Sequence, residues 1–241
     1  MKLTAVHTDI FKAREHLPAF ILRHIPQVPE KSILAVASKL LALWKGEILP
    51  YESPAQKEAL IRRESSSALK TPLAWLTIKD GMIMTNAGID ESNADGKLLL
   101  LPKDCYAAAE ELRRALCARW GVKELGILVT DSMILPLRAG VTAAAVAYAG
   151  FKGVKDLRGT PDIFGKKLEV TLVNAADSLA SAAALCMGEG KEQSPLCVIE
   201  NAPVEFRPGA NADEIKYPAE NDLYTPLFQA AGLIKKGDCN D

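Results

Sequence analysis

The stretch TNAGIDESN, residues 85–93, places an acid, Asp90, in a glycine-containing turn directly after an apolar strand. A second acid, Asp131, begins what we expect to be another turn with Ser132, after the apolar strand 125–130. Mg²⁺ and Mn²⁺ prefer oxygen ligands and usually hold nucleotide phosphates between protein carboxylates. Two acids at two strand ends therefore indicate metal-dependent phosphoryl chemistry.

The composition is that of an ordinary globular protein. The chain has 241 residues, of which 49% are hydrophobic and 24% charged, so it can bury a substantial core. We expect one domain, 1–241, with two subdomains of unclear boundary as the alternative. The net charge of −1 argues against a nucleic-acid partner. The chain contains no apolar run of membrane-spanning length, and because charged residues stand near its start we expect no signal peptide.

The cysteines indicate the cellular compartment in which the protein resides. Five are scattered along the chain, and no two have the spacing of a zinc site or a redox motif. We therefore expect free thiols in a cytoplasmic protein without membrane attachment.

Hairpins and strand–helix–strand pieces alternate irregularly along the chain. Strands are expected at 32–38, 98–101, 125–130, 168–174 and 195–200, with a hairpin over 74–87 that turns at Asp80-Gly81. Helices are expected before Pro26, over 105–120 after an Asp104 cap, over 178–187 after an Asp177 cap, and around 222–234. This mixture indicates an α+β fold with mixed sheets and packed helices. The common phosphate-binding loop GxxxxGK[ST] is absent from the sequence.

Short motifs recur in a fixed order between about residues 8 and 199. They are Ser38-Lys39, TNAGIDESN, 98–102, Asp131-Ser132, Arg138-x-Gly140-x-Thr142, Asp156-x-Arg158-Gly159, Asp177 and Met187-Gly188-Glu189. In these motifs the chain resembles the coenzyme F420-0:L-glutamate ligases, the γ-glutamyl ligase family often called CofE. Residues 158–165 and 187–196 are most similar to a bacterial branch described as folate-metabolism γ-glutamate ligases.

The resemblance implies a chemistry, a fold and an assembly. Members of the family join L-glutamate to an acceptor carboxylate, using a nucleoside triphosphate, usually GTP, and divalent metal. The reaction passes through an acyl phosphate. The implied structure is a CofE-like fold in an intertwined homodimer. The implied cofactors are GTP or ATP as co-substrate and two divalent cations, Mg²⁺ or Mn²⁺, with K⁺ as a further candidate.

The same resemblance assigns residues to the site. Asp90 and Asp131 would ligate one metal, and Ser132 and Glu189 would contact a second. The implied nucleotide-binding residues are Thr8, Asp9, Ile10, Phe11, Ser38, Lys39, Asn93, Met187, Gly188, Glu189, Gly190, Lys191, Glu192, Gln193 and Ser194. A weaker match makes Arg138, Gly140, Thr142 and Arg158 substrate-binding residues.

Taken one by one, these residues also allow simpler roles. Asp90 could bond its own backbone in a turn, and Asp131 could simply begin a loop. Gly188 could only end a helix, and Arg138 and Arg158 could form surface ion pairs. The histidines have no ligand-like spacing and are not expected in the site.

Two departures from the family bear on the acceptor. The deazaflavin-type enzymes carry Thr-Phe-Gly-Arg-Pro-Trp-Arg after the acid, whereas here Leu135 replaces the first arginine and Leu137 the tryptophan. Losing a cation beside a phosphodiester would cost about 1.5–3 kcal/mol of binding. The leading expectation is therefore ligation of glutamate to a reduced folate. The alternatives are the same chemistry on coenzyme F420-0, and a non-catalytic nucleotide- or metal-binding relative.

Overall fold

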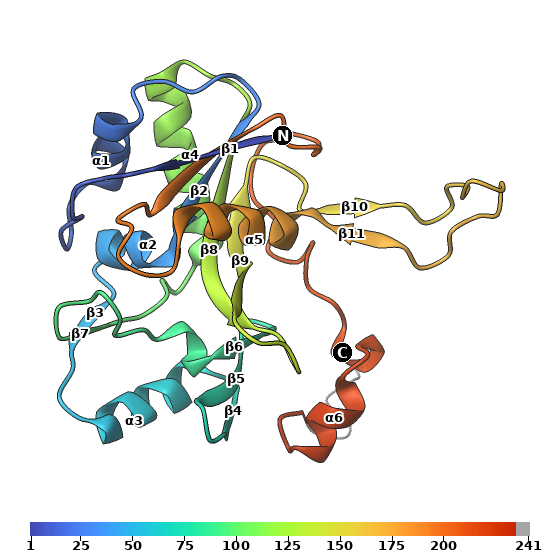
Figure 1. Cartoon of the computed structure of the whole chain (residues 1–241). Helices are drawn as coiled ribbons and strands as arrows, with labels where there is room; N and C mark the ends of the chain where they lie inside the picture. Colours follow the sequence, from blue (N-terminus) through green and yellow to red (C-terminus); the bar gives the residue numbers. More distant parts are fainter. Residues whose placement is uncertain (235–241) are drawn as a thin grey trace. The chain divides into compact units, whose positions relative to one another are not determined.

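The computed structural model describes residues 1–234, which form two compact units. Unit 1 comprises residues 1–46 and 102–215, and unit 2 comprises residues 47–101 together with the segment from 216. Their helices and small mixed sheets confirm the expected α+β class (Figure 1). No helix within residues 1–234 has both the length and the apolar character needed to cross a membrane.

Unit 1 is built on a five-stranded sheet in the order β1-β12-β2-β8-β9. The strands are β1 (Lys2–Val6), β12 (Leu196–Glu200), β2 (Ser32–Ala37), β8 (Leu125–Ile134) and β9 (Val141–Ala149). β2 and β8 are parallel, and the other neighbouring pairs are antiparallel. The residues that follow β1 and β2, the segment Asp131–Ser132 of β8 and the loop that precedes β12 therefore lie at one edge, which we call the carboxyl edge.

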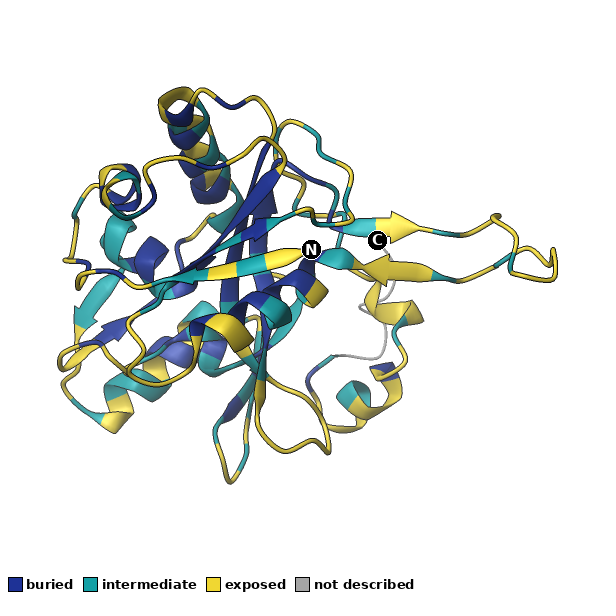
Figure 2. Ribbon diagram, turned by 45° about the horizontal axis from the view of Figure 1, so that its top comes forward, coloured by how far each residue is buried: buried dark blue, intermediate teal, exposed yellow. Residues whose placement is uncertain are grey.

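Helices cover both faces of this sheet. α1 (Leu17–His24), α2 (Ser38–Lys45) and α4 (Cys105–Trp120) pack on one face, and α5 (Ala175–Met187) packs on the other. The alternation of side chains along β2 divides its residues between the two cores: Leu34 and Val36 face the three helices, whereas Ile33 and Ala35 face α5. The central strands are accordingly buried on both sides (Figure 2).

The pairing of β8 with β9 corrects the expected turn at Asp131-Ser132. β8 continues to Ile134, so both residues lie inside the strand, opposite Ala144 and Ala143 of β9. The register shifts between Val129 and Thr130, which leaves Val146 as an extra residue on β9. Local sequence could not reveal this extension because Asp and Ser are depleted in strands, and pairing with the small residues of β9 overrides that preference.

Two further expectations in unit 1 need correction. The predicted strand 168–174 is confined to β11 (Leu172–Asn174), and it pairs with β10 (Val154–Asp156), a strand that was not predicted. Asn174, not Asp177, caps α5: its side chain accepts a hydrogen bond from the Asp177 backbone N–H. The Asp177 carboxylate instead accepts from the Ala145 N–H of β9 at 2.8 Å, beside the register shift. β10 and β11 form an exposed arm (Figures 1 and 2).

Unit 2 contains two small sheets and short helices. The strands are β3 (Ile48–Pro50) with β7 (Lys97–Leu99), and β4 (Ser67–Lys70), β5 (Trp75–Lys79) and β6 (Met82–Thr85). The helical segments are α3 (Pro54–Glu64), η1 (Asn86–Gly88), η2 (Ala219–Asn221) and α6 (Thr225–Ala230). The predicted hairpin is confirmed: Asp80 and Gly81 take φ values of 52° and 79°, as its tight turn requires.

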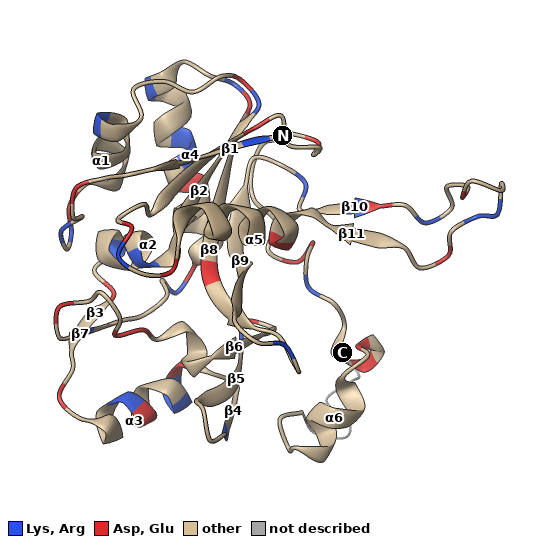
Figure 3. Cartoon of the chain, viewed as in Figure 1, with Lys and Arg blue, Asp and Glu red and all other residues tan. Residues whose placement is uncertain are grey.

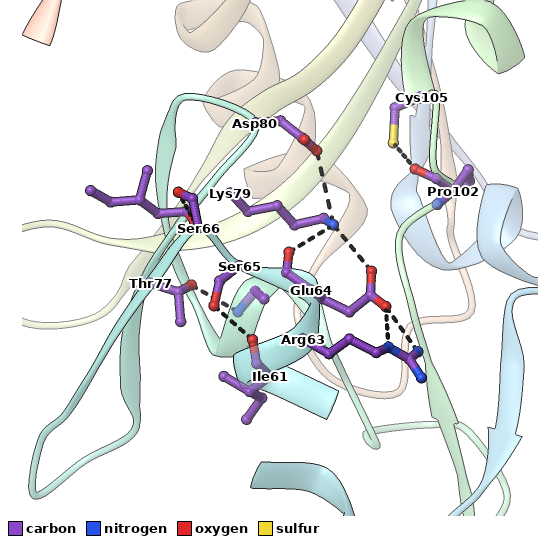
Figure 4. A network of polar contacts seen from close by, with 12 residues as sticks. Ile61, Arg63, Glu64, Ser65, Ser66, Thr77, Lys79, Asp80, Pro102 and Cys105 are labelled. Atoms are coloured by element: carbon purple, nitrogen blue, oxygen red, sulfur yellow. Dashed lines mark hydrogen bonds and ion pairs between the residues drawn. The ribbon is translucent and has the colours of Figure 1, made fainter. Parts of the chain in front are cut away.

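A polar network holds α3 against the hairpin of unit 2. Lys79 is buried, and its Nζ donates to the Glu64 carbonyl at 3.1 Å and approaches the Glu64 carboxylate at 3.4 Å (Figure 4). Burial alone would raise the pKa of Glu64, but the contacts from Arg63 and Lys79 lower it below its ordinary value. Basic and acidic residues are interspersed along the rest of α3 (Figure 3), as expected for a partly solvated helix face.

The four described cysteines are free thiols, as expected, and Cys239 lies outside the described residues. Cys197 is buried in β12, and burial raises the pKa of its thiol to about 11. Cys105 and Cys117 are partly buried, whereas Cys186 on α5 is exposed. The thiol of Cys197 is therefore protonated at neutral pH.

Gly150, directly after β9, is a position where the fold requires glycine. Its φ is +87°, and an added Cβ would lie 2.0 Å from the carbonyl oxygen of Leu125. We expect Gly150→Ala to lower the free energy of unfolding by about 3 kcal/mol, from a left-handed backbone and a steric clash together. Urea unfolding measures this change. Gly121→Ala is the matched control, because its φ is +69° but its Cβ would meet nothing within 4 Å; equal losses in the two variants would contradict the role of the close approach.

Candidate active site

The carboxyl edge of the unit 1 sheet brings together several residues predicted for the site. Ala37 and Thr130 are paired in the parallel strands β2 and β8, so Ser38 and Asp131, the next residue of each segment, are neighbours. The Ser38 hydroxyl donates to Asp131 Oδ1 at 2.9 Å. Ser38 is buried at the start of α2, and Asp131 is half-buried. This hydrogen bond orients one carboxylate at the carboxyl edge and shows that these two segments meet there.

A second pair lies on the other face of β8. Side chains of successive strand residues point to opposite faces, so Ser132 projects away from Asp131 and toward the side that α5 covers. Glu189 follows α5, and its Oε2 accepts from the Ser132 hydroxyl at 2.8 Å. Both residues are exposed. Alternation along one strand thus places two oxygen pairs on successive residues but on opposite faces of β8, one containing Asp131 and one containing Glu189.

The loop between α5 and β12 is held by hydrogen bonds at its far end. The Thr8 N–H donates to the Gln193 carbonyl at 3.0 Å, and Gln193 Nε2 donates to the Thr8 carbonyl at 3.2 Å. His7 Nδ1 lies 3.0 Å from the Glu192 carbonyl, and since a carbonyl only accepts, the ring nitrogen donates. These bonds extend the β1–β12 pairing past Val6 and Leu196.

Of the four residues 8–11 predicted to bind nucleotide, two are buried and two are exposed. Thr8 and Phe11 are buried, and the Phe11 ring packs edge-on against Phe20 at 4.8 Å, so both belong to the packing of unit 1. Asp9 and Ile10 are exposed. Met187 is likewise buried, in the core under α5. Nucleotide contacts by the remaining residues stay a prediction.

Two histidines that sequence spacing did not single out contact the predicted segments. His7 bonds the Glu192 carbonyl, as described above. His24 Nδ1 donates to the Phe20 carbonyl, which leaves Nε2 to accept from the Asp9 N–H at 3.2 Å. The Asp9 carboxylate also lies 3.4 Å from the His24 ring. The only sequence signal for His7 was its position beside Thr8, and none marked His24.

The predicted residues 138–142 and Arg158 lie on two separate hairpins of unit 1. Thr142 donates to the Ser181 hydroxyl of α5 at 2.8 Å, which ties the start of β9 to the helix. Arg158, on the exposed arm, forms a two-pronged ion pair with Asp156 and lowers the pKa of that carboxylate to about 2. The ion-pair role considered for Arg158 is therefore present, and anion binding by Arg138 or Arg158 stays a prediction.

Asp90 and Asn93 belong to unit 2, where a constrained backbone carries Asp90. Asn86, Ala87 and Gly88 take φ values of 52°, 54° and 71°, a run of left-handed residues that is costly for a non-glycine residue. The Thr77 hydroxyl stabilises this turn by accepting from the Ala87 N–H at 2.9 Å. The turn is therefore well defined rather than loosened by its glycine.

The Asp90 side chain accepts from the Ser92 N–H at 2.7 Å and from the Ser92 hydroxyl at 3.0 Å. Its backbone N–H and carbonyl both bond Leu99. The simpler role considered for Asp90, a turn aspartate, is thus present. Metal ligation by Asp90 stays a prediction from the family motif.

The chemistry of these donors suits a hard cation. In unit 1, Asp131, Ser132 and Glu189 offer carboxylate and hydroxyl oxygens, the ligands that Mg²⁺ and Mn²⁺ prefer, and in unit 2 Asp90 offers a carboxylate. Within residues 1–234, no three His, Cys, Asp or Glu side chains are clustered closely enough to hold a metal by themselves. Phosphate oxygens and water would therefore have to complete the coordination, as is usual for Mg²⁺ in nucleotide-dependent enzymes.

A cavity of about 400 Å³ lies at the opposite edge of the sheet and is lined by residues that include Lys31, Glu124 and Asn201. Lys31 precedes β2 and Glu124 precedes β8, so the cavity lies away from the carboxyl edge. None of the residues predicted for the site lines it. We therefore assign the candidate site to the carboxyl edge. The basis is the two hydrogen-bonded pairs, Ser38 with Asp131 and Ser132 with Glu189, and not the cavity.

Comparisons with known proteins support one family. The sequence model of the F420-0:Gamma-glutamyl ligase family matches residues 5–201. A coenzyme F420:L-glutamate ligase of Methanopyrus kandleri is 32% identical over 207 residues, which cover 78% of this chain and 82% of that protein. Relatives of the same name from Archaeoglobus fulgidus and Methanococcus maripaludis are each 37% identical, over 69% and 59% of this chain. The match to the Methanococcus protein spans only 57% of that protein's length.

Proposed function

The chain belongs to the F420-0:Gamma-glutamyl ligase family, and on that premise we propose that it is a γ-glutamyl ligase dependent on a nucleoside triphosphate and divalent metal. The observation that carries the proposal is the pair of contacts at the carboxyl edge, Ser38 with Asp131 and Ser132 with Glu189. They hold one carboxylate, Asp131, within β8, and bond a second, Glu189 of the following loop, to the next residue of that strand. This arrangement suits the binding of polyphosphate through cations.

The reaction needs activation because a carboxylate is a poor electrophile. Transfer of the γ-phosphoryl group to an acceptor carboxylate oxygen releases the nucleoside diphosphate and forms an acyl phosphate. The amine of glutamate then attacks the acyl carbon, the C–N bond forms, phosphate leaves, and the amine loses a proton. Divalent cations supply charge neutralisation on the phosphate oxygens.

The residues of this chain contribute mainly position and charge. Asp131 and Glu189 would hold the cations, with Ser38 orienting the first carboxylate and Ser132 bonding the second. Asp90 of unit 2 is a further proposed cation ligand, on the basis of the family motif. Ser38, Lys39 and the exposed part of the loop before β12 would contact the nucleotide. Such positioning accounts for most of the catalysis in phosphoryl transfer.

We propose coenzyme F420-0 as the acceptor. The names of the relatives support this acceptor better than the reduced folate expected from the sequence. The folate expectation rested on the likeness of residues 158–165 and 187–196 to the folate-metabolism branch, and on Leu135 and Leu137, which are exposed on the β8–β9 hairpin. Exposed apolar side chains do not by themselves identify an acceptor, so the relatives carry more weight.

An acceptor assay is expected to distinguish the two substrates. With labelled L-glutamate, Mn²⁺ or Mg²⁺, and GTP or ATP in parallel, we expect incorporation into F420-0 with a kcat/KM at least about tenfold above that for tetrahydrofolate. One charge-assisted contact to the phosphodiester of F420-0, a group that tetrahydrofolate lacks, is enough for a difference of this size. Labelling of tetrahydrofolate alone would replace F420-0 by folate. Failure to release nucleoside diphosphate with either acceptor would favour the non-catalytic alternative.

We also propose that the protein is a homodimer, as the family resemblance implies. The arm formed by β10 and β11 supports this, because Ile163, Phe164 and Val170 are 92%, 88% and 85% exposed. Large apolar side chains grouped in this way often mark protein–protein contacts. Light scattering of the purified chain tests the assembly.

A further inference from the structure

Glu192 differs from the other residues of the loop between α5 and β12, because its carboxylate turns back into the loop. Its Oε2 accepts from the Gly190 N–H at 2.8 Å. A Cβ added at Gly188 would lie 2.4 Å from the Glu192 carboxyl carbon, and one at Gly190 would lie 3.4 Å from Oε2. The carboxylate therefore occupies the space left by the two glycines on either side of Glu189.

The backbone of the loop gives an independent reason for this arrangement. Gly188 has φ 83° and ψ 164°, a conformation that is essentially restricted to glycine. The carbonyl of Glu192 is held separately, by His7 and by the Ser194 hydroxyl at 3.2 Å. The main chain at Glu192 is thus anchored to the segment after β1, while its side chain closes the turn that carries Glu189.

We propose that Glu192 is a positioning residue, whose carboxylate fixes the turn 188–190 so that Glu189 meets Ser132. This inference rests on the proposed function, in which Glu189 holds a cation. It also gives Glu192 a role different from the nucleotide contact that the family resemblance predicts for it. Because Glu192 is exposed, its contribution is to the shape of the loop and not to global stability.

Three variants test the proposal through the binding of Mn²⁺, measured by electron paramagnetic resonance in the presence of nucleotide but without glutamate. Glu192→Ala is expected to weaken Mn²⁺ binding about 10- to 100-fold, the usual effect of removing a group that orients a metal ligand. Glu192→Gln keeps an oxygen that accepts from Gly190 and is expected to stay within about threefold of wild type. Gly188→Ala displaces the carboxylate and should resemble Glu192→Ala.

Glu200→Gln is the control, since Glu200 lies at the other end of β12 in an ion pair with Lys2. The Mn²⁺ affinity of Glu200→Gln should match that of wild type. The melting temperature should match wild type in every variant except Gly188→Ala. Unchanged or tighter Mn²⁺ binding in Glu192→Ala would overturn the positioning role. Equal losses in the Gln and Ala variants would also overturn it, because the charge would then matter and not the hydrogen bond. If wild type itself binds no Mn²⁺ with nucleotide, the proposed function fails, which is a different result.

Discussion

Replacing Asp131 by Asn is expected to lower kcat/KM for glutamate addition by more than about 100-fold and to leave the fold intact. A hard cation prefers a charged oxygen, and losing groups that only orient a metal ligand already costs about 10- to 100-fold. Asn keeps an oxygen that can accept from the Ser38 hydroxyl, the contact that orients Asp131 in the structure. The measurement is steady-state kinetics with F420-0, with the unfolding midpoint recorded for each variant.

Two further variants make this result specific. Glu124→Gln is the control, because Glu124 precedes β8 at its other end, where it forms an exposed ion pair with Lys31. It is expected to retain wild-type kinetics. Ser38→Ala removes the orienting hydrogen bond but leaves the charge, so its loss of activity should be smaller than that of Asp131→Asn. Full activity of Asp131→Asn would remove Asp131 from the metal site.

The elements predicted well from the sequence are those with strong local signals. The Asp104 carboxylate caps α4 by accepting from the Ala107 N–H, and Gly121 ends the same helix in a left-handed conformation. The Asp80-Gly81 turn fixes the register of β5 and β6. In each case the deciding interaction lies within a few residues of its signal, so no knowledge of distant segments was needed.

The elements predicted poorly depend on distant partners. β8 extends through Asp131 and Ser132 because β9 pairs with them, and no local pattern encodes that pairing. Asp177 looked like a helix cap, but its carboxylate is bonded to β9 while Asn174 caps α5. The helix is capped three residues earlier, and the Asp177 carboxylate is thereby free of the capping role and bonds a distant strand.

The candidate site likewise has features that the sequence indicated and features that it did not. Family motifs identified Ser38, Asp131, Ser132 and Glu189, and the structure brings them together in two hydrogen-bonded pairs. The motifs did not indicate that Asp131 and Ser132 project to opposite faces, because that follows from their place inside a strand. They also missed His7, whose contact with Glu192 joins segments 185 residues apart in sequence.

Asp90→Asn is expected to reduce kcat/KM for glutamate addition by more than about 100-fold, because it removes the charge from a proposed metal ligand. The backbone of this segment should tolerate the change. Asn can still accept from the Ser92 N–H, and the left-handed turn before it is held by bonds that do not involve Asp90, such as that from Ala87 to Thr77. The melting temperature is therefore expected to stay within a few degrees of wild type.

Asp95→Asn provides a matched control on the same loop. The Asp95 side chain is 99% exposed, and its carboxylate lies 3.8 Å from Lys97 Nζ, so this ion pair contributes little to stability. Asp95→Asn should therefore change neither the fold nor the activity. Loss of activity in both variants would point to a general effect of charge on this loop. Wild-type activity of Asp90→Asn would leave Asp90 with only the structural role that its bonds to Ser92 already show. A selective loss at Asp90 would establish that its carboxylate, and not merely its turn, is needed for the reaction.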